Sequence, residues 1–369
     1  MRVLVWQWGR RGAGPRYAAE LARSFAAVPG TECVLSLAAG AELLRAADPP
    51  HCDLPFPTYA GVVGFALRAL RAPLLLPRLV AWLRAQRVDV ALCAMPAPLD
   101  LVMAAALRRA GVPFAVVVHD ADTHPGDGFP LQMRLQRRLL GHADGLVALS
   151  THVADRLREQ GAGGRMLMTG SLPPFAFGPP PPPPGAHGGK LRLLSFGRLL
   201  PYKGLDLLAG GLARLGPRDG LEVRVVGSGP HSPALDALRA MPGVTVENRW
   251  VPEDEVGALM AWSDALVLSH REASQSGVAA AAIAARRRIV ATRVGGLAEQ
   301  LHGVPGALLC DPTPDSLAAA LRTLLDHGLA GPAWPDVPDG SGVPARMVAA
   351  LAGLRRPLHP GPGRGTPPA

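Results

Sequence analysis

Short apolar runs alternate with longer segments of helical periodicity along most of the chain, in two successive sets of four. Strands that are buried on both faces of a parallel sheet read as continuous apolar runs, and the helices between them cover the two faces. We therefore expect two α/β units, each built on a doubly wound parallel sheet. The first set of runs lies at residues 3–6, 88–94, 113–119 and 145–150, and the second at 191–196, 221–227, 264–269 and 288–292.

A proline-rich segment, GPPPPPPGAHGGK at residues 178–190, separates the two sets. Six consecutive prolines can enter neither a helix nor a central strand, so we expect a stiff linker. The chain of 369 residues also exceeds the roughly 250–300 at which single cores stop growing. We predict Rossmann-like domains at residues 1–177 and 191–355 and a disordered tail at 356–369. Because ligands of such sheets bind at the carboxyl ends of the strands, the site should lie in a central cleft between the domains.

Cysteine spacing and hydropathy bear on the compartment. The four cysteines lie far apart, with no CxxC pair and no Cys/His ligand spacing, which favours neither a disulfide framework nor a zinc site. The first apolar run is too short for a signal peptide, and no uncharged apolar stretch reaches about 18 residues. We expect a protein of the reducing cytoplasm without a membrane-spanning segment.

A glycine-rich loop, with Gly9, Gly12 and Gly14, follows the first apolar run and precedes a segment of helical periodicity. Glycines let the backbone approach a ligand closely, and the amino terminus of the next helix offers free N–H groups. The spacing is not GxGxxG, and no acidic residue about 20 positions later ends a second strand, which argues against a dinucleotide site. A tight turn without a ligand remains the alternative.

The segment HDADTHPGD follows the run at 113–119 and allows three interpretations. Asp120 and Asp122 form a DxD pair, which could hold a divalent metal on a sugar nucleotide. Alternatively, His119 donates a hydrogen bond to a substrate hydroxyl or phosphate, and Asp120 lies near the acceptor. A buried histidine with a structural partner is the third possibility.

Two cations lie in GRLLPYKGLD, which connects the run at 191–196 to the next helical segment. Lys203 is notable because the chain has only two lysines among 38 lysine and arginine residues. A lysine presents a compact charge beside a phosphate, whereas Arg198 can add a bidentate contact. Both side chains are expected to point over the sheet edge into the cleft.

A second loop, SHREASQSGV, precedes an alanine-rich helical segment. Ser276 is a candidate N-cap, and Gly277 and Val278 would offer unpaired backbone N–H groups. A helix amino terminus opposite Arg198 and Lys203 would bind a diphosphate without a metal. Glu272 would be repelled by a phosphate and suits the hydroxyls of a sugar.

These segments together resemble the family-4 retaining glycosyltransferases of GT-B fold. The resemblance is carried by the glycine loop, HDADTHPGD, ADGLVALSTHV, GRLLPYKGLDLL, VVGSGP, SHREASQSGV and IVATRVGGLAE, which occur in the family's order over roughly residues 1–325. It implies hexosyl transfer from a nucleotide-diphosphate sugar with retention of configuration and with no cofactor or required metal. It also implies a glycan or lipid-linked acceptor in polysaccharide or glycolipid synthesis.

The resemblance implies roles for individual residues. Arg198 and Lys203 match the pair that neutralises the donor diphosphate, Glu272 matches the acid that holds donor-sugar hydroxyls, and His119 matches the histidine near the sugar. Gly12 and Gly14 match the loop that closes over the cleft. The sequence also departs from the family. Ala280 replaces the second glutamate expected eight positions after Glu272, and three arginines at 286–288 replace the usual glycine before a proline-led strand.

Basic amphipathic segments at residues 61–87 and 131–140 are consistent either with ordinary domain helices or with peripheral contact to an anionic membrane. The net charge of +9 does not predict a nucleic-acid partner, because the basic residues are scattered and no base-stacking motif occurs. Two alternatives to a transferase remain at this point, namely a nucleotide-sugar epimerase of the same fold and a catalytically silent nucleotide-sugar-binding homologue.

Overall fold

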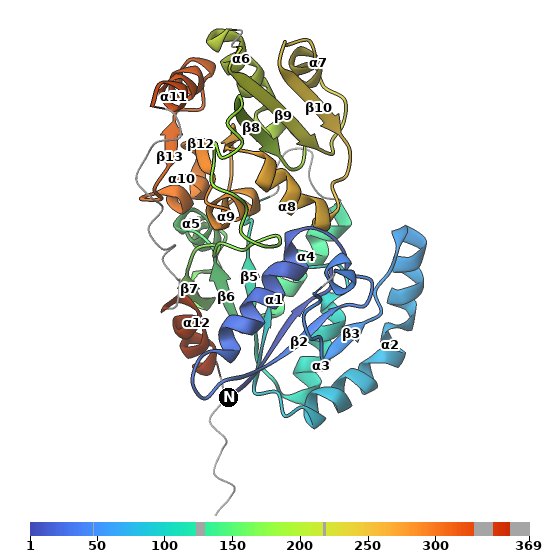
Figure 1. The fold of residues 1–369 in the computed structure, drawn as a ribbon. Helices are drawn as coiled ribbons and strands as arrows, with labels where there is room; N and C mark the ends of the chain where they lie inside the picture. Colours follow the sequence, from blue (N-terminus) through green and yellow to red (C-terminus); the bar gives the residue numbers. More distant parts are fainter. Residues whose placement is uncertain (47, 123–129, 217–218, 328–341, 355–369) are drawn as a thin grey trace, which may run out of the picture.

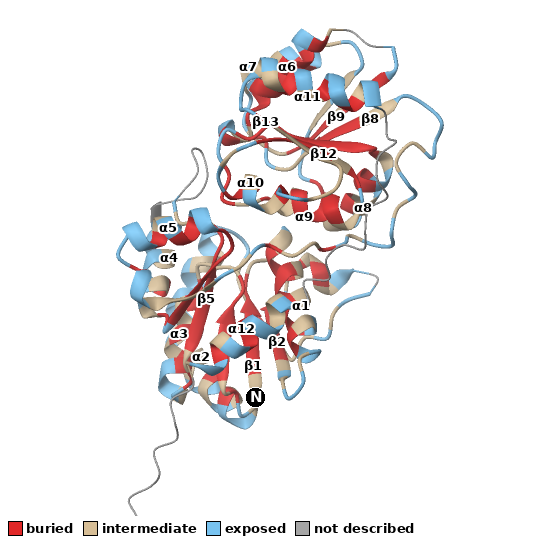
Figure 2. Cartoon of the chain, turned by 90° about the vertical axis from the view of Figure 1, so that its left-hand side faces the viewer, coloured by how far each residue is buried: buried red, intermediate tan, exposed pale blue. Residues whose placement is uncertain are grey.

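The protein is described by a computed structural model covering residues 1–46, 48–122, 130–216, 219–327 and 342–354. Two α/β units lie one above the other, with the N-terminal unit below (Figure 1). Buried residues concentrate on the strands and on the helix faces turned toward them (Figure 2). The predicted pair of doubly wound parallel sheets is confirmed.

The described residues of the N-terminal unit form a seven-stranded sheet in the order β3-β2-β1-β4-β5-β6-β7, with every adjacent pair parallel. The four apolar runs predicted in this half are strands β1, β4, β5 and β6, whereas β2, β3 and β7 were not predicted. The strands are β1 (Arg2–Gln7), β2 (Glu32–Ala38), β3 (Leu54–Phe56), β4 (Val90–Cys93), β5 (Phe114–Val118), β6 (Gly145–Ala148) and β7 (Met166–Thr169).

The described residues of the C-terminal unit form a six-stranded parallel sheet in the order β10-β9-β8-β11-β12-β13. This order reverses beside the first strand of the unit, as in dinucleotide-binding folds. The four predicted runs are β8, β9, β11 and β12, and the outer strands β10 and β13 were not predicted. The strands are β8 (Leu191–Phe196), β9 (Leu221–Gly227), β10 (Val244–Asn248), β11 (Ala265–Leu268), β12 (Arg288–Thr292) and β13 (Ala307–Cys310).

Helices connect the strands and cover both faces of each sheet (Figure 1). Within the described ranges, none of them is both long enough and apolar enough to cross a membrane. The helices are α1 (Ala13–Ala26), α2 (Gly61–Ala85), α3 (Asp100–Ala110), α4 (Pro130–His142), α5 (Thr151–Glu159), α6 (Leu205–Leu215), α7 (Pro233–Arg239), α8 (Glu253–Trp262), α9 (Gly277–Ala284), α10 (Gly295–Leu301), α11 (Pro314–His327) and α12 (Gly342–Ala352), with short 3₁₀ turns at Glu42–Arg45, Gly163–Arg165 and Pro201–Lys203.

Strand β1 shows why these runs are apolar at every position. Leu4 and Trp6 belong to a core cluster with residues of α2 and α3, whereas Val3 and Val5 belong to a second cluster with residues of α1. All four side chains are fully buried. Because side chains alternate across a strand, both faces of β1 carry a core, and the run cannot alternate with polar residues.

The proline-rich segment is fixed to the C-terminal unit. A turn at residues 184–187 brings the Gly185 amide to 2.6 Å from Asp264 Oδ1 and His187 Nε2 to 3.0 Å from Asp264 Oδ2. The buried Asp264 carboxylate also accepts from the Arg192 amide at 2.9 Å. The first residues of the linker, 178–180, are exposed, whereas Gly185 and His187 are bound to the C-terminal unit.

The last described helix returns to the N-terminal unit. Met347, Val348 and Leu351 of α12 are buried in the cluster that contains Val3 and Phe25. The sequence had placed this segment in the C-terminal domain of residues 191–355, whereas the helix packs beside α1 and β7 (Figure 1). The predicted tail at 356–369 lies outside the described residues.

The three arginines at 286–288 have separate structural roles. Arg286 adopts a left-handed conformation with φ of 53°, a region that favours glycine. The Arg287 side chain is buried, and its Nε donates to the Met260 carbonyl at 2.8 Å. Arg288 begins β12. The basic run thus belongs to the structure of the C-terminal unit.

Candidate active site

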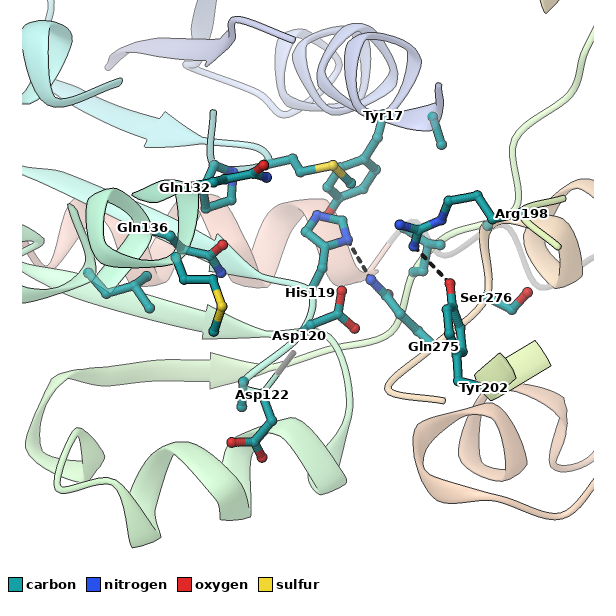
Figure 3. A pocket seen from close by; sticks show the side chains of 18 of the residues that line it. Tyr17, His119, Asp120, Asp122, Gln132, Gln136, Arg198, Tyr202, Gln275 and Ser276 are labelled. Carbon is teal, nitrogen blue, oxygen red and sulfur yellow. Dashed lines mark hydrogen bonds between the residues drawn. The ribbon is translucent and has the colours of Figure 1, made fainter. Parts of the chain in front are cut away.

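A cavity of about 620 Å³ lies between the two units. Figure 3 shows side chains from the loop after β5 and from α1 and α4 of the N-terminal unit facing side chains of the C-terminal unit. Four of the residues singled out for the donor site line this cavity together with His119 and Asp120 from the other side. These four are Arg198, Lys203, Ser276 and Gly277.

Lys203 ends the 3₁₀ turn that follows β8. Its Nζ lies 2.8 Å from His270 Nε2 and 5.1 Å from the centroid of the Tyr202 ring. Gly204 follows with φ of 64°, and a Cβ there would lie 2.0 Å from the Ser269 carbonyl oxygen. Only glycine fits this position, because both the conformation and the close approach exclude a side chain. The tight turn thus places the lysine on the cavity wall.

Arg198 approaches the same tyrosine from the other end. Its Nη2 donates to the Tyr202 hydroxyl at 2.8 Å, as the dashed line in Figure 3 shows. Tyr202 is buried and contacts both cations, so one aromatic ring links Arg198 and Lys203 on the cavity wall. Tyr202 was not among the predicted site residues, although it lies between Arg198 and Lys203 in the segment GRLLPYKG.

The amino terminus of α9 lies on the same wall. Ser276 is the N-cap and its hydroxyl accepts from the Ala279 amide at 3.2 Å, as predicted. Gln300 holds this turn from α10, since its side chain accepts from the Ser276 amide at 2.8 Å and donates to the Ser276 carbonyl at 3.1 Å. The first amides of an α-helix have no intrahelical partner and carry partial positive charge. Gly277 therefore adds to the positive potential beside Arg198 and Lys203.

Val278, the third member of the predicted helix start, lies next to the β8 loop. Its Cγ2 is 3.5 Å from where a Cβ of Gly197 would be. The residues described as lining the cavity include Gly277 but not Val278. Val278 thus packs the helix start against the loop that carries Arg198.

His119 follows β5 and is nearly inaccessible to solvent. Its Nε2 lies 2.8 Å from the Ala94 carbonyl oxygen, which can only accept, so Nε2 carries the proton and Nδ1 is an acceptor. Burial lowers the pKa of His119, which favours this neutral ring. The predicted donation to a substrate is therefore corrected, because the one N–H of the ring is already used within the protein.

Gln275 is the partner of the other ring nitrogen. The Gln275 side-chain amide donates to His119 Nδ1, which joins the two units across the cavity (Figure 3). The Tyr17 ring stands edge-on to the imidazole, with centroids 5.3 Å apart and an interplanar angle of 88°. Neither residue was predicted from the sequence, since neither a lone glutamine between two serines nor a tyrosine in an apolar helix forms a motif.

The two aspartates of the DxD pair have different surroundings. Both line the cavity, but Asp122 also pairs with Arg156 at 2.7 Å, and this hydrogen bond lowers the Asp122 pKa. Among the described residues, no group of three or more His, Cys, Asp or Glu side chains has an arrangement that could hold a metal ion. The remaining part of the motif, residues 123–127, lies outside the described residues.

Glu272 lies in a neighbouring cavity of about 200 Å³, with Asp122, His152 and Arg156. The two cavities share Ala121 and Asp122 on their walls. The structure therefore brings Glu272 near the larger cavity but does not place it among the residues that line it. The spacing of residues in the sequence does not determine whether Glu272 lines the larger cavity or its neighbour.

The glycine loop packs against β1 and leads into α1. Gly12 is the N-cap of α1 with φ of 79°. A Cβ on Gly14 would lie 2.9 Å from Gln7 Nε2 and 3.2 Å from Met95 Sδ. Ala13 and Tyr17 line the cavity, but Gly12 and Gly14 are not among its described lining residues. The loop thus brings α1 to the cavity.

Ala280, which replaces the family's second glutamate, is fully buried. It belongs to the same core cluster as Tyr17, Leu172 and Phe175 of the N-terminal half. A glutamate at this position would bury a carboxylate among apolar side chains, which is costly without a partner. The alanine therefore fits an apolar contact between the two units.

Two further polar contacts join the units. Arg16 of α1 forms a half-buried ion pair with Glu253 of α8. The Glu299 carboxylate of α10 accepts from the Thr151 and His152 amides at 2.7 and 2.9 Å. A carboxylate at the amino terminus of α5 is favourable, because it satisfies free amides and meets the positive end of the helix.

Two facing Rossmann-like units with a cation-lined cavity between them define the GT-B architecture. A model described as Glycosyltransferase Family 4 matches residues 14–166, and one described as Glycosyl transferases group 1 matches residues 190–327. The chain therefore belongs to the family-4 glycosyltransferases, and the resemblance inferred from its motifs is confirmed.

Solved structures show the same fold at low sequence identity. Anabaena HepE in complex with UDP and glucose is 18% identical, with 96% of this chain and 95% of HepE covered and a TM-score of 0.63. Sucrose-phosphate synthase from Thermosynechococcus elongatus is 16% identical, with 96% of each chain covered and a TM-score of 0.62. A glycosyltransferase from Rickettsia africae is 16% identical, with 96% and 94% covered and a TM-score of 0.61. No curated protein sequence matches the chain.

Proposed function

We propose that the chain is a retaining glycosyltransferase that moves a hexosyl group from a nucleotide-diphosphate sugar to a glycan or lipid-linked acceptor. The observation that carries the proposal is the single cavity lined by Arg198, Lys203 and the start of α9 on one side and by His119 on the other. The HepE structures that contain UDP and UDP-glucose support a nucleotide sugar as donor.

The cations and the helix start would stabilise the leaving group. Cleavage of the bond between the anomeric carbon and the diphosphate develops negative charge on the phosphate oxygens. Arg198, Lys203 and the Gly277 amide approach this charge from one wall, and preorganised groups of this kind are usually the largest catalytic contribution. Because these groups supply positive charge themselves, the proposed reaction needs no metal.

The neutral His119 would help to hold a sugar. Its Nδ1 can only accept a hydrogen bond, so it suits a hydroxyl and not a phosphate oxygen. No side chain with the character of a general base is required on this face, since the departing phosphate can take the proton of the acceptor hydroxyl as the new bond forms. Because the diphosphate would leave from the same face of the anomeric carbon that the acceptor hydroxyl attacks, the configuration would be retained.

The acceptor would bind against α4. Gln132, Gln136 and Arg137 line the N-terminal side of the cavity, and Figure 3 shows both glutamines beside it. Side-chain amides can both donate to and accept from hydroxyls, so this wall suits a carbohydrate. This arrangement supports a glycan-containing acceptor in polysaccharide or glycolipid synthesis.

Helix α2 supports peripheral contact with an anionic membrane at the cytoplasmic leaflet. Val63, Leu67, Leu70 and Leu74 form one stripe at helical spacing and are between 53% and 78% exposed. Arg71 and Arg78 are exposed on the same helix. Exposed leucines beside arginines match the chemistry of an anionic bilayer surface.

Vesicle sedimentation at low salt tests the membrane contact. Wild-type protein should bind phosphatidylglycerol-containing vesicles and not purely phosphatidylcholine vesicles, and Leu70→Ser/Leu74→Ser should weaken that binding at least about tenfold, since each buried leucine contributes about 1.5–3 kcal/mol. Equal sedimentation of the double variant and the wild type would exclude α2 as the contact surface. The transferase proposal does not depend on this result.

Donor turnover tests the transferase proposal. Wild-type protein is incubated with UDP-glucose, GDP-mannose, ADP-glucose and dTDP-glucose, with and without a crude glycolipid acceptor fraction. We expect one donor to lose its sugar faster when acceptor is present. Conversion of a donor to its epimer without acceptor would favour an epimerase, and binding without turnover would favour a catalytically silent homologue.

A further inference from the structure

The contact between Gln275 and His119 lies inside the proposed active site and is made across the two units. Gln275 follows Ser274 in the loop before α9, and His119 follows β5. Both side chains line the cavity that also contains Arg198 and Lys203. A sugar attached to a diphosphate at those cations would therefore reach the space around His119.

The hydrogen bonds of His119 leave one role for Nδ1. The Ala94 carbonyl fixes the proton on Nε2, and the Gln275 amide supplies a proton donor to the Nδ1 lone pair. Exchange of the amide oxygen and nitrogen of Gln275 would place two acceptors against each other, so the nitrogen must face the ring. Any other group that occupies this position must also be a donor.

The glutamine is an imperfect occupant of this position. Within the part of the chain that the structure describes, its Oε1 is buried without a hydrogen-bond partner. A buried acceptor that lacks a partner offsets the gain from a single hydrogen bond. If another group donated to His119 Nδ1 in place of Gln275, the glutamine side chain could turn away. Its amide oxygen and nitrogen could then both form hydrogen bonds with other partners, and the cost of the unpartnered Oε1 would be removed.

We propose that the Gln275 amide and a hydroxyl of the donor sugar compete for the same lone pair of His119. This inference rests on the proposed function. Gln275 is then a positioning residue that holds the ring and the loop before α9 together until a sugar hydroxyl replaces it. A sugar hydroxyl is the fitting competitor because it donates one hydrogen bond, whereas phosphate oxygens cannot donate to Nδ1.

Calorimetric titration of Gln275→Met tests the competition. Methionine keeps the length of the side chain but cannot donate to Nδ1. UDP-glucose, GDP-mannose, ADP-glucose and dTDP-glucose are titrated into wild type and variant, together with the corresponding nucleoside diphosphates. We expect the sugar nucleotide that binds wild type to bind the variant about fivefold more tightly, which corresponds to one net hydrogen bond. The affinity for its nucleoside diphosphate, which has no sugar hydroxyl at this position, should not change.

Two controls keep the outcomes distinct. Gln86 lies beyond the end of α2, and the variant Gln86→Met should bind both ligands with wild-type affinity. In a His119→Phe background, Gln275→Met should no longer change the affinity for the sugar nucleotide. Unchanged or weaker binding of the sugar nucleotide to folded Gln275→Met, judged by its thermal unfolding, would overturn the competition alone. Absence of binding of all four sugar nucleotides to wild type would overturn the proposed function and the competition with it.

Discussion

Replacement of Lys203 by alanine should lower turnover at least a hundredfold. The Lys203 ammonium lies 2.8 Å from His270 Nε2 and 5.1 Å from the Tyr202 ring centroid, on the wall that also contains Gly277. Loss of one preorganised group that faces developing charge costs about 3–4 kcal/mol. This energy corresponds to a rate reduction of about a hundred- to a thousandfold.

The variant Lys203→Arg tests why a chain rich in arginine has a lysine here. A guanidinium is planar and larger, so it cannot occupy the place of an ammonium between His270 and Tyr202 without displacing its charge. Misplacement of a reacting group by about 1 Å can cost about a hundredfold in rate. We expect turnover between that of the wild type and that of the alanine variant.

The assay measures sugar transfer at saturating donor, and thermal unfolding of each variant is the control for folding. Lys190→Ala removes the other lysine of the chain, which is exposed at the end of the linker, and should leave turnover unchanged. The unfolding midpoint of Lys203→Ala should fall by only a few degrees, since the side chain contacts His270 and Tyr202 at the cavity wall and is not part of a hydrophobic core. Turnover of Lys203→Ala at the wild-type rate would refute its role in stabilising the leaving group.

Two further predictions concern stability. Burial raises the Asp100 pKa from 3.8 to about 7, so the folded state holds a proton between about pH 4 and pH 7 that the unfolded state has lost. The free energy of unfolding should therefore fall as pH rises over this range, by up to about 1.4 kcal/mol per pH unit. Urea titrations at several pH values should show that Asp100→Asn lacks this contribution to the pH dependence. The same pH dependence in wild type and variant would contradict the prediction. Arg286→Gly should raise the free energy of unfolding by about 1 kcal/mol, because glycine adopts the observed φ of 53° without strain. A decrease in the unfolding midpoint of that variant would contradict this explanation.

Eight of the inner strands of the two sheets could be predicted from the sequence, whereas the four edge strands β3, β7, β10 and β13 and the inner strand β2 could not. Runs such as β5 and β11 are buried on both faces, and burial leaves an uninterrupted apolar pattern. Strand β10 reads VTVEN and lies at the sheet edge, where only part of its surface is covered. Strand β7 is only half-buried. Such segments look like loops because their stability comes from pairing with a neighbour that the sequence does not specify locally.

The charged part of the candidate site was predictable for a related reason. Arg198 and Lys203 follow β8 directly, and Ser276 begins the helix after β11, so sheet topology alone brings them to one edge. The contact between Gln275 and His119 joins residues from different units, and no local pattern in either segment indicates it. The position of Glu272 in the neighbouring cavity depends on how the loop turns before α9, which residue spacing does not determine.

Titration of a nucleoside diphosphate into an Arg198→Ala/Lys203→Ala double variant tests most directly whether these cations and the start of α9 form one diphosphate site. The ligand is the diphosphate of the donor base that wild type selects, and the matching nucleoside is titrated in parallel. We expect the double variant to lose at least about a hundredfold in affinity for the diphosphate, since hydrogen bonds to charged groups contribute about 1.5–3 kcal/mol each, and to keep its affinity for the nucleoside. Equal affinity of wild type and double variant for the diphosphate would show that the nucleotide binds elsewhere.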